Sequence, residues 1–300
     1  MHLRRCPTYL VPIVLVVAGL AAAQEIALPI ALPNAPTSLK FAIIGDSGTG
    51  SKSQYAVAEK LIAARRQFPY EFVLMMGDNL YGGSGPKDFQ KKFENPYKPL
   101  IDSGMKFYAT LGNHDNPNEA YYKGWNMKGE RYYTFKPKAG VRFFSLDSNY
   151  MDQKQLDWLD KALAASGSDW KICFFHHPIY SSGGAHGSNL QLRAQLEPLF
   201  LKYGVDAVFA GHEHFYERIK PQKGIYYFTS GGAAKLREGD VGKSELTAKS
   251  FDTGYHFMLI ELAKDKMHFQ AISDQGKTVD SGTLTRFSDA DKKKLSTATP

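Results

Sequence analysis

Five short apolar segments of this chain each end in residues that bind metal ions. The segments are KFAIIGD with Asp46, EFVLMMGDNLY with Asp78 and Tyr81, KFYATLGNHD with Asn113 and His114, KICFFHHP with His176, and DAVFAGHEH with His212 and His214. Runs of this length that are rich in Val, Ile, Phe and Tyr are typical of strands buried on both faces. In layered α/β architectures such strands deliver their terminal side chains to one edge of a sheet, where ligands bind. The pattern therefore predicts a metal site at that edge.

Strands and helices alternate in the first two thirds of the chain, and strands dominate afterwards. Helical periodicity is present over residues 51–68, 152–165 and 189–203, and the later strands are expected at 225–230, 255–262, 266–273 and 278–286. A hydrophobic content of 43% is enough for a real core in a chain of 300 residues. The order of elements predicts an α/β protein with two packed sheets rather than one wound sheet.

The N-terminus predicts a secretory signal peptide over residues 1–23. Arg4 and Arg5 precede an uncharged stretch, residues 10–23, that is short for a bilayer span and ends in three alanines. We therefore expect a secreted protein, extracellular or periplasmic, with no stable membrane anchoring after the signal is cleaved.

The mature chain is expected to be one catalytic domain with short flanking segments. A proline-rich lead-in covers residues 24–37, the domain covers 38–287, and the polar composition of 288–300 predicts a disordered tail. Cys173 remains alone once Cys6 leaves with the signal, so no intrachain disulfide is expected. We expect a monomer.

The charge of the chain excludes one class of partner. Its formal net charge is +7, and removing Arg4 and Arg5 leaves +7 − 2 = +5. Three of these charges, residues 292–294, lie in the predicted tail, and the rest are dispersed. We therefore expect no nucleic-acid partner, whereas a mildly positive body suits a small anionic substrate.

The donor types at the strand ends predict two metal ions. Asp46, Asp78 and Asn113 offer oxygen atoms, which prefer hard or borderline cations such as Fe, Mn and Zn, and the histidines cluster around them. The set is too large for one ion, so a carboxylate bridge is expected at Asp78, where Gly77 lets the backbone come close. Two such ions clamp a phosphoryl group and activate water, which predicts phosphoester hydrolysis.

The same residues resemble the motifs of the calcineurin-like metallophosphoesterases. The matching motifs are, in order, GDSG with Asp46, GDNLY with Asp78, GNHD with Asn113 and His114, FFHHP with His176, and GHEH with His212 and His214. Tyr81 in GDxxY is similar to the tyrosine that binds ferric iron in the purple acid phosphatases, here of the small, single-domain type. The resemblance implies a four-layer α-β-β-α sandwich of two mixed sheets flanked by helices.

The resemblance also implies a division of the ligands between two sites. The first site has Asp46, Asp78, Tyr81 and His214 and holds Fe(III), and the second has Asp78, Asn113, His176 and His212 and holds Fe(II), Zn or Mn. Its activity is acid phosphatase: a metal-bound hydroxide attacks a phosphomonoester in line with the ester oxygen. A general acid must protonate the leaving group; His114 is the first choice and His186 the second. Asp115 could orient His114 by hydrogen bonding or cap the following loop.

Two other functions stay open from the sequence. One is a phosphodiesterase or nucleotidase that uses Zn or Mn and whose tyrosine is not a ligand. The other is a catalytically silent protein that binds metal and phosphate, against which the complete set of ligand residues argues. His177 could pack or hydrogen-bond the backbone as readily as it contacts substrate.

Overall fold

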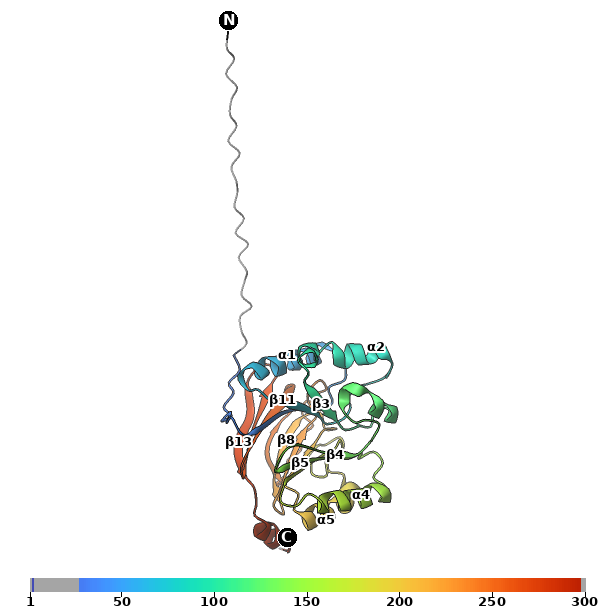
Figure 1. Cartoon of the computed structure of the whole chain (residues 1–300), viewed down its shortest axis with the longest axis vertical. Helices are drawn as coiled ribbons and strands as arrows, with labels where there is room; N and C mark the ends of the chain where they lie inside the picture. Colours follow the sequence, from blue (N-terminus) through green and yellow to red (C-terminus); the bar gives the residue numbers. More distant parts are fainter. Residues whose placement is uncertain (1, 3–26, 298–300) are drawn as a thin grey trace.

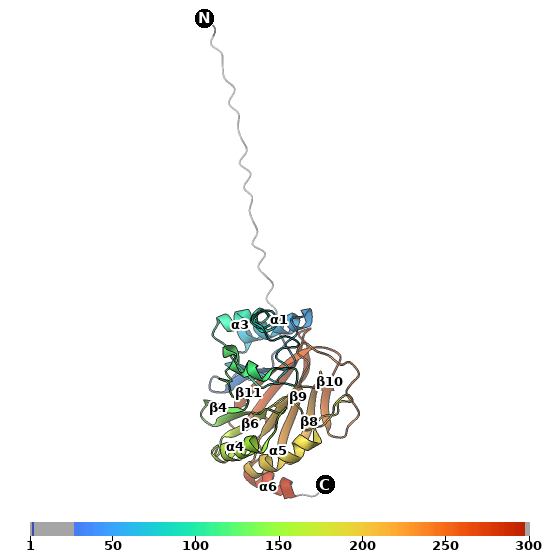
Figure 2. The same cartoon turned by 90° about the vertical axis from the view of Figure 1, so that its right-hand side faces the viewer.

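Two mixed sheets packed face to face form the centre of the molecule (Figure 1). The computed structural model describes residue 2 and residues 27–297, so the predicted signal peptide lies outside the described residues except for residue 2. Figure 2 shows α1 (Lys52–Gln67) and α3 (Lys98–Asp102) on one side, and α4 (Gln153–Ala164) and α5 (Leu190–Tyr203) on the other. The predicted four-layer α/β sandwich is confirmed.

The first sheet has six strands within the described residues. Their order is β13 (Thr278–Thr285), β12 (Lys266–Ser273), β11 (His256–Ala263), β1 (Leu39–Ile44), β2 (Phe72–Met75) and β3 (Lys106–Ala109). Strands β1, β2 and β3 run parallel, and β1 pairs antiparallel with β11. Parallel neighbours need a crossover, and α1 supplies it between β1 and β2.

The second sheet has seven strands within the described residues. Their order is β10 (Thr247–Phe251), β8 (Tyr216–Gln222), β9 (Ile225–Ser230), β7 (Ala207–Ala210), β6 (Trp170–Phe174), β5 (Val141–Ser145) and β4 (Tyr133–Lys138). Strands β5, β6, β7 and β9 are parallel neighbours, with α4 and α5 as crossovers. The short helical turns are α2 (Pro86–Phe89), η1 (Gln90–Glu94), η2 (Pro117–Tyr121) and η3 (Lys123–Trp125).

The long crossover helices begin where a polar side chain caps their first turn. Asp152 accepts a hydrogen bond from the backbone N–H of Gln155, and Asn189 accepts one from Leu192. A cap of this kind satisfies one of the N–H groups that a helix leaves unpaired at its start. These caps place the helix starts within one residue of the sequence prediction.

Aromatic rings fill the space between the sheets. Phe41 of β1 stacks on Phe72 of β2 at 5.3 Å between ring centroids. The same ring meets Phe143 of the second sheet edge-on at 5.2 Å and Phe209 at 6.4 Å. Aromatic pairs in these geometries contribute about 0.5–1.5 kcal/mol each beyond their buried area. The packing fixes the two sheets against each other and so fixes the positions of their strand ends.

The five predicted strands are divided between the two sheets. Three are β1, β2 and β3 of the first sheet, and two are β6 and β7 of the second. The expectation of a single sheet edge is therefore wrong, because the polar residues come from neighbouring ends of two packed sheets. The sequence pattern predicts that five strands end in metal-binding residues, but it does not indicate to which sheet each strand belongs.

The C-terminal segment differs from the predicted disorder. It forms α6 (Asp289–Thr297), in which the side chain of Lys292 is buried. Its ammonium donates to the carbonyl of Gly204 at 2.7 Å and pairs with the carboxylate of Asp206, which also binds Arg286. The polar composition of the segment predicted disorder, because composition does not show that one buried ion pair can hold such a segment against the domain. No helix in the described part of the chain is long and apolar enough to cross a bilayer.

We expect His256 at the start of β11 to make the fold sensitive to acid. Its ring is fully buried, with Nε2 3.0 Å from Ser230 Oγ, and burial lowers its pKa from 6.5 to about 3. The unfolded chain then binds a proton below 6.5 that the folded protein does not, so stability falls as pH drops from 6.5 towards 3. At about 1.4 kcal/mol per pKa unit, the loss reaches about 5 kcal/mol.

The variant His256→Gln stays neutral at all of these pH values, so its melting temperature should fall less than that of the wild type between about pH 7 and about pH 4. Thermal melts over this range measure the difference. His268→Gln, on the neighbouring strand β12, is the matched control. Equal slopes in wild type and His256→Gln would contradict a neutral buried histidine.

Candidate metal centre

The residues predicted for the first metal site lie together. Asp46, Asp78 and His214 each offer a ligand atom, and these atoms are all within 4.8 Å of one another. The Tyr81 hydroxyl donates to Asp46 Oδ1 at 3.1 Å and lies 3.2 Å from His214 Nε2. Two carboxylates, an imidazole and a phenol therefore converge on one point.

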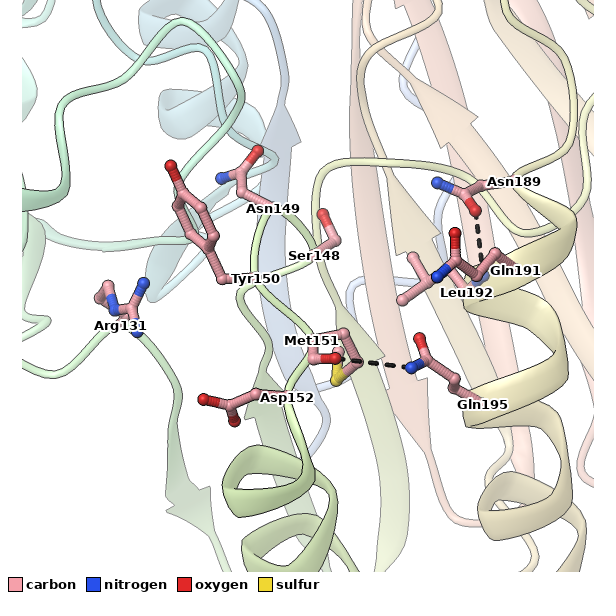
Figure 3. A pocket seen from close by; sticks show the side chains of 10 residues that line it. All are labelled: Arg131, Ser148, Asn149, Tyr150, Met151, Asp152, Asn189, Gln191, Leu192 and Gln195. Carbon is pink, nitrogen blue, oxygen red and sulfur yellow. Dashed lines mark hydrogen bonds between the residues drawn. The ribbon is translucent and has the colours of Figure 1, made fainter.

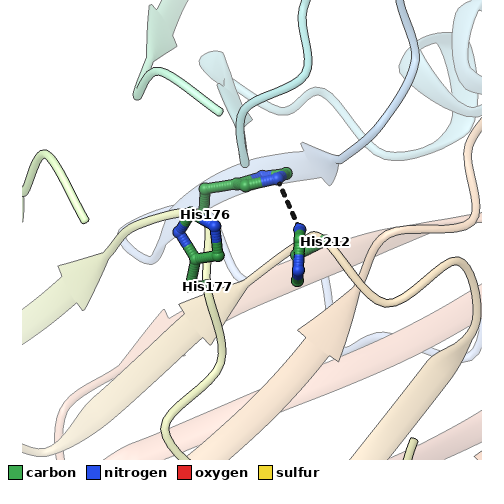
Figure 4. A group of neighbouring side chains, drawn as sticks. All are labelled: His176, His177 and His212. Atoms are coloured by element: carbon green, nitrogen blue, oxygen red, sulfur yellow. Dashed lines mark hydrogen bonds between the residues drawn. The ribbon is translucent and has the colours of Figure 1, made fainter. Parts of the chain in front are cut away.

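The residues predicted for the second site form an adjoining group. His176, His212 and their neighbour His177 offer nitrogen atoms within 4.8 Å of one another (Figure 4). Asn113 Oδ1 is 3.0 Å from His176 Nε2, and Asp78 Oδ1 is 3.4 Å from the same nitrogen. Asp78 thus touches both groups, which is the position that a bridging carboxylate requires.

Three of the predicted ligands have a left-handed backbone. The φ angles are 56° at Asp46, 49° at Asp78 and 69° at His212. This conformation is uncommon outside glycine, and residues held in it concentrate at functional sites. Hydrogen bonds retain it: the backbone N–H of His212 donates to Asp46 Oδ2 at 2.9 Å, and that of His114 to Asp78 Oδ1 at 3.0 Å. The carboxylates at the ends of β1 and β2 are therefore held by backbone amides of the turns that follow β7 and β3.

Glycines make room for these side chains. A Cβ atom on Gly112 would stand 2.1 Å from Asp78 Oδ1, and one on Gly211 would stand 2.6 Å from Asp46 Oδ2. Both distances are far below van der Waals contact, so the carboxylates occupy space that only glycine leaves open. The glycines that precede Asn113 and His212 in the sequence are therefore packing requirements of the site.

The tautomer of His176 follows from its surroundings. Its Nδ1 lies 2.8 Å from the carbonyl oxygen of Met76, which can only accept, so Nδ1 carries the proton. The lone pair of Nε2 then faces Asn113, Asp78 and His212. This is how a neutral metal-binding histidine is usually oriented, by a hydrogen bond from its other nitrogen.

The electrostatics of the site fit cations. Asp46 and Asp78 are almost fully buried, and within the described residues neither forms an ion pair with a lysine or arginine. Burial, together with the charge of Asp78, raises the pKa of Asp46. Burial also lowers the pKa of His176, and it lowers that of His212 to about 2, so neither ring supplies positive charge. Buried oxygen and nitrogen donors without a basic partner are the set that two metal ions would satisfy.

The two predicted general acids lie at the open rim of the site. The ring of His114 is exposed, 4.8 Å from the Tyr81 ring, and its imidazole has no hydrogen bond within the described residues. The ring of His186 is also exposed, 4.3 Å from that of His212. Its Nε2 accepts a hydrogen bond from the guanidinium of Arg237 at 2.9 Å, because a guanidinium only donates.

Asp115 has a different contact from the one expected. Its carboxylate accepts hydrogen bonds from the backbone of Gly112 at 2.8 Å and of Leu80 at 2.9 Å, and from Asn79 Nδ2 at 2.8 Å. Among the described residues no hydrogen bond joins it to the His114 ring. Asp115 instead fastens together the two loops that carry Asp78 and Asn113, and an orienting effect on His114 stays a prediction.

Sequence reasoning missed a cluster that joins the rim loops. Glu213, between two predicted ligands, is fully buried and accepts a hydrogen bond from the backbone of Gly187 at 2.6 Å. Its carboxylate also pairs with Arg237 at 3.5 Å, and burial raises its pKa to about 7. Arg237 and Lys235 follow β9 in the segment SGGAAKLR, where a strand ends in paired glycines. That signal resembles the other five strand ends, although no metal-binding residue follows it directly.

His177, whose role the sequence left open, lies inside the site. Its Nδ1 is 2.9 Å from Ser148 Oγ, and its ring is 4.4 Å from that of His212. Ser148 follows β5, so this contact joins a loop of the second sheet to the site. His177 therefore faces the predicted ligands rather than the opposite side of its strand end.

A match over most of the domain decides the family. Residues 39–216, which include every predicted metal residue, match the family described as calcineurin-like phosphoesterase. The chain belongs to this family.

Its relatives include named acid phosphatases. Human tartrate-resistant acid phosphatase type 5 is 26% identical, over 88% of this chain and 96% of the relative. Purple acid phosphatase 7 of Arabidopsis thaliana is 28% identical, over 84% and 87%. Both alignments include nearly the whole of this phosphoesterase.

Two solved structures share its fold. Purple acid phosphatase PPD1 from yellow lupin has a TM-score of 0.71 at 19% identity, covering 87% of this chain and 56% of that one. GAP50, described as the anchor in the inner membrane complex of Plasmodium, has a TM-score of 0.75 at 21% identity, covering 88% and 95%. Because a phosphatase and an anchor protein share this fold, the fold alone does not decide the activity.

We expect Gly112→Ala to lose metal without unfolding. The new Cβ would displace the carboxylate of Asp78. Overpacking of this kind lowers the free energy of unfolding by about 1–3 kcal/mol. Gly85→Ala is the matched control, because its Cβ would meet Asp88 at an ordinary 3.6 Å. Elemental analysis of metal per chain, with circular dichroism as the check on folding, measures the effect. Full metal content in Gly112→Ala would contradict the bridging position of Asp78.

Proposed function

We propose that this chain is an exported acid phosphatase of the purple acid phosphatase type, with a dinuclear Fe(III)–M(II) centre. It is a phosphoric monoester hydrolase whose substrate is a small phosphomonoester. The observation that carries the proposal is the position of the Tyr81 hydroxyl, 3.1 Å from Asp46 and 3.2 Å from His214. The acid phosphatase relatives support the reaction. Export rests on the apolar N-terminal segment and stays a prediction.

The donor sets differ in a way that supports two different metals. Asp46, Asp78, Tyr81 and His214 would hold the first ion, and a phenolate favours a trivalent one. Asp78, Asn113, His176 and His212 would hold the second, where neutral nitrogen and amide donors suit Fe(II), Zn or Mn. When bound, the metals supply charge neutralisation of the phosphoryl group and activation of water.

The free imidazole of His114 supports its role as the proton donor to the leaving group. The Nε2 lone pair of His186 is occupied by Arg237, so His186 can face a substrate only through Nδ1. His114 has both ring nitrogens available at the rim beside Tyr81. We therefore assign general-acid catalysis to His114 and phosphate binding to His186.

A cleft next to the second metal group leaves room for the rest of the substrate. One cavity of about 380 Å³ reaches Asn113 and His177, and a second of about 590 Å³ continues it past Tyr150 (Figure 3). Figure 3 shows amide side chains facing this space, including Asn189 at the start of α5. A polar cleft of this kind suits an alcohol leaving group with hydroxyls of its own.

A phosphodiesterase or nucleotidase with Zn or Mn is the second candidate. The observation that favours it is the same contact, because the hydroxyl of Tyr81 also satisfies Asp46 as an ordinary hydrogen-bond donor. In that case the tyrosine orients a carboxylate and no phenolate is needed.

Metal analysis with a visible spectrum separates the two candidates. Protein purified without added metal should contain iron and show a tyrosinate-to-iron charge-transfer band, and Tyr81→Phe should lose that band because it lacks the phenolate oxygen. The phenyl ring keeps the packing of Tyr81, so the folded structure is preserved. A colourless, fully active enzyme loaded with zinc or manganese would overturn the iron assignment in favour of the second candidate.

We expect His114→Ala to slow alkyl phosphates more than activated aryl phosphates. A poor leaving group needs the donated proton, and general acid catalysis contributes about 10²–10⁴-fold, whereas a nitrophenolate leaves without it. Steady-state kcat on both substrates measures the ratio, with His268→Ala as the control. Equal losses would point to a positioning role, and no turnover of either ester by the metal-loaded wild type would favour a silent protein.

A further inference from the structure

Lys235 is held in a fixed position above the first metal group. It lies on the connection that follows β9, and its neighbours on both sides are anchored. The carbonyl of Ala234 accepts a hydrogen bond from Ser53 Oγ at 3.0 Å, and the backbone N–H of Arg237 donates to the carbonyl of His214 at 3.2 Å. The backbone around Lys235 is therefore tied both to the first turn of α1 and to a predicted ligand.

In the part of the chain that the structure describes, the ammonium group of Lys235 has no carboxylate partner. Its Nζ lies 4.5 Å from the centroid of the Tyr81 ring, and the side chain is half-buried. Within the described residues it forms no hydrogen bond and no ion pair, so its three donors are uncommitted. The hydroxyl of the same tyrosine points at Asp46 and His214. A free cation thus stands at the mouth of the site where the phosphoryl group would bind.

The other cation of this loop is used differently. The guanidinium of Arg237 donates to His186 at 2.9 Å and pairs with the buried Glu213 at 3.5 Å. Its donors hold the rim loops together. Of the two basic residues in the segment SGGAAKLR, Lys235 is the one whose charge is available to a ligand.

We propose that Lys235 binds a phosphoryl oxygen of the substrate and selects phosphomonoesters over phosphodiesters. The proposal rests on the proposed phosphatase function and adds a residue that distinguishes substrates by the charge of their phosphoryl group. A monoester has a second ionisation near pKa 6 and carries up to two negative charges, whereas a diester carries one. An additional cation close to the phosphoryl oxygens stabilises the dianion more than the monoanion. Lys235 is therefore a specificity-determining residue.

Paired substrates test this proposal with the metal-loaded full chain. Lys235→Met keeps an unbranched side chain of similar length beside Tyr81 and removes the charge, and Lys243→Met, at an exposed position further along the same connection, is the matched control. On 4-nitrophenyl phosphate we expect kcat/KM to fall about tenfold, mainly through KM, because a charge-assisted hydrogen bond is lost. On bis(4-nitrophenyl) phosphate the loss should be less than about twofold, and Lys235→Arg should restore most of the monoester activity.

Phosphate affinity gives a readout that does not depend on turnover. Calorimetric titration of the metal-loaded protein with inorganic phosphate should show a Kd about tenfold higher in Lys235→Met than in wild type. Equal Kd values, or equal losses of kcat/KM on both esters, would overturn the proposal. Wild-type protein that binds phosphate but hydrolyses neither ester would overturn the phosphatase function instead, and the Kd comparison would still decide the role of Lys235.

Discussion

Two carboxylates buried without a basic side chain are the constraint on which the site depends. Asp46 and Asp78 sit at the ends of adjacent strands, and the surrounding histidines are kept neutral by burial. An ionised carboxylate in such a place is stable only with compensating positive charge. Backbone amides supply part of this compensating charge, and metal cations held by the surrounding donors would supply the rest. The left-handed turns, the close glycines and the hydrogen bonds of Asp115 all serve to hold these two side chains where they are.

The sequence predicted the parts of this structure that follow from local pattern. The five apolar runs are strands, and the residues at their ends converge as expected. Helix starts at capping residues such as Asp152 and Asn189 were equally readable, because an N-cap and the periodicity behind it are contained in a few adjacent positions.

The contacts that the sequence did not predict depend on partners that lie far apart in the chain. The hydrogen bonds of Asp115 go to three groups whose geometry no short motif encodes. The Lys292 contact with Asp206 spans the C-terminal part of the domain, so composition suggested disorder where a helix docks. Lys235 and Arg237 were overlooked for a related reason. Their loop carries no predicted metal ligand, and its position is set by hydrogen bonds to α1 and to His214.

The division of the ligands between two sheets has a mechanical consequence. Asp46, Asp78 and Asn113 belong to one sheet, and His176, His212 and His214 to the other. Ions bound by both sets would act as a cross-link between the sheets, in addition to the aromatic packing between them. The sheets could then neither slide nor separate without first giving up the ions, so metal occupancy and the resistance of the sandwich to unfolding become one property.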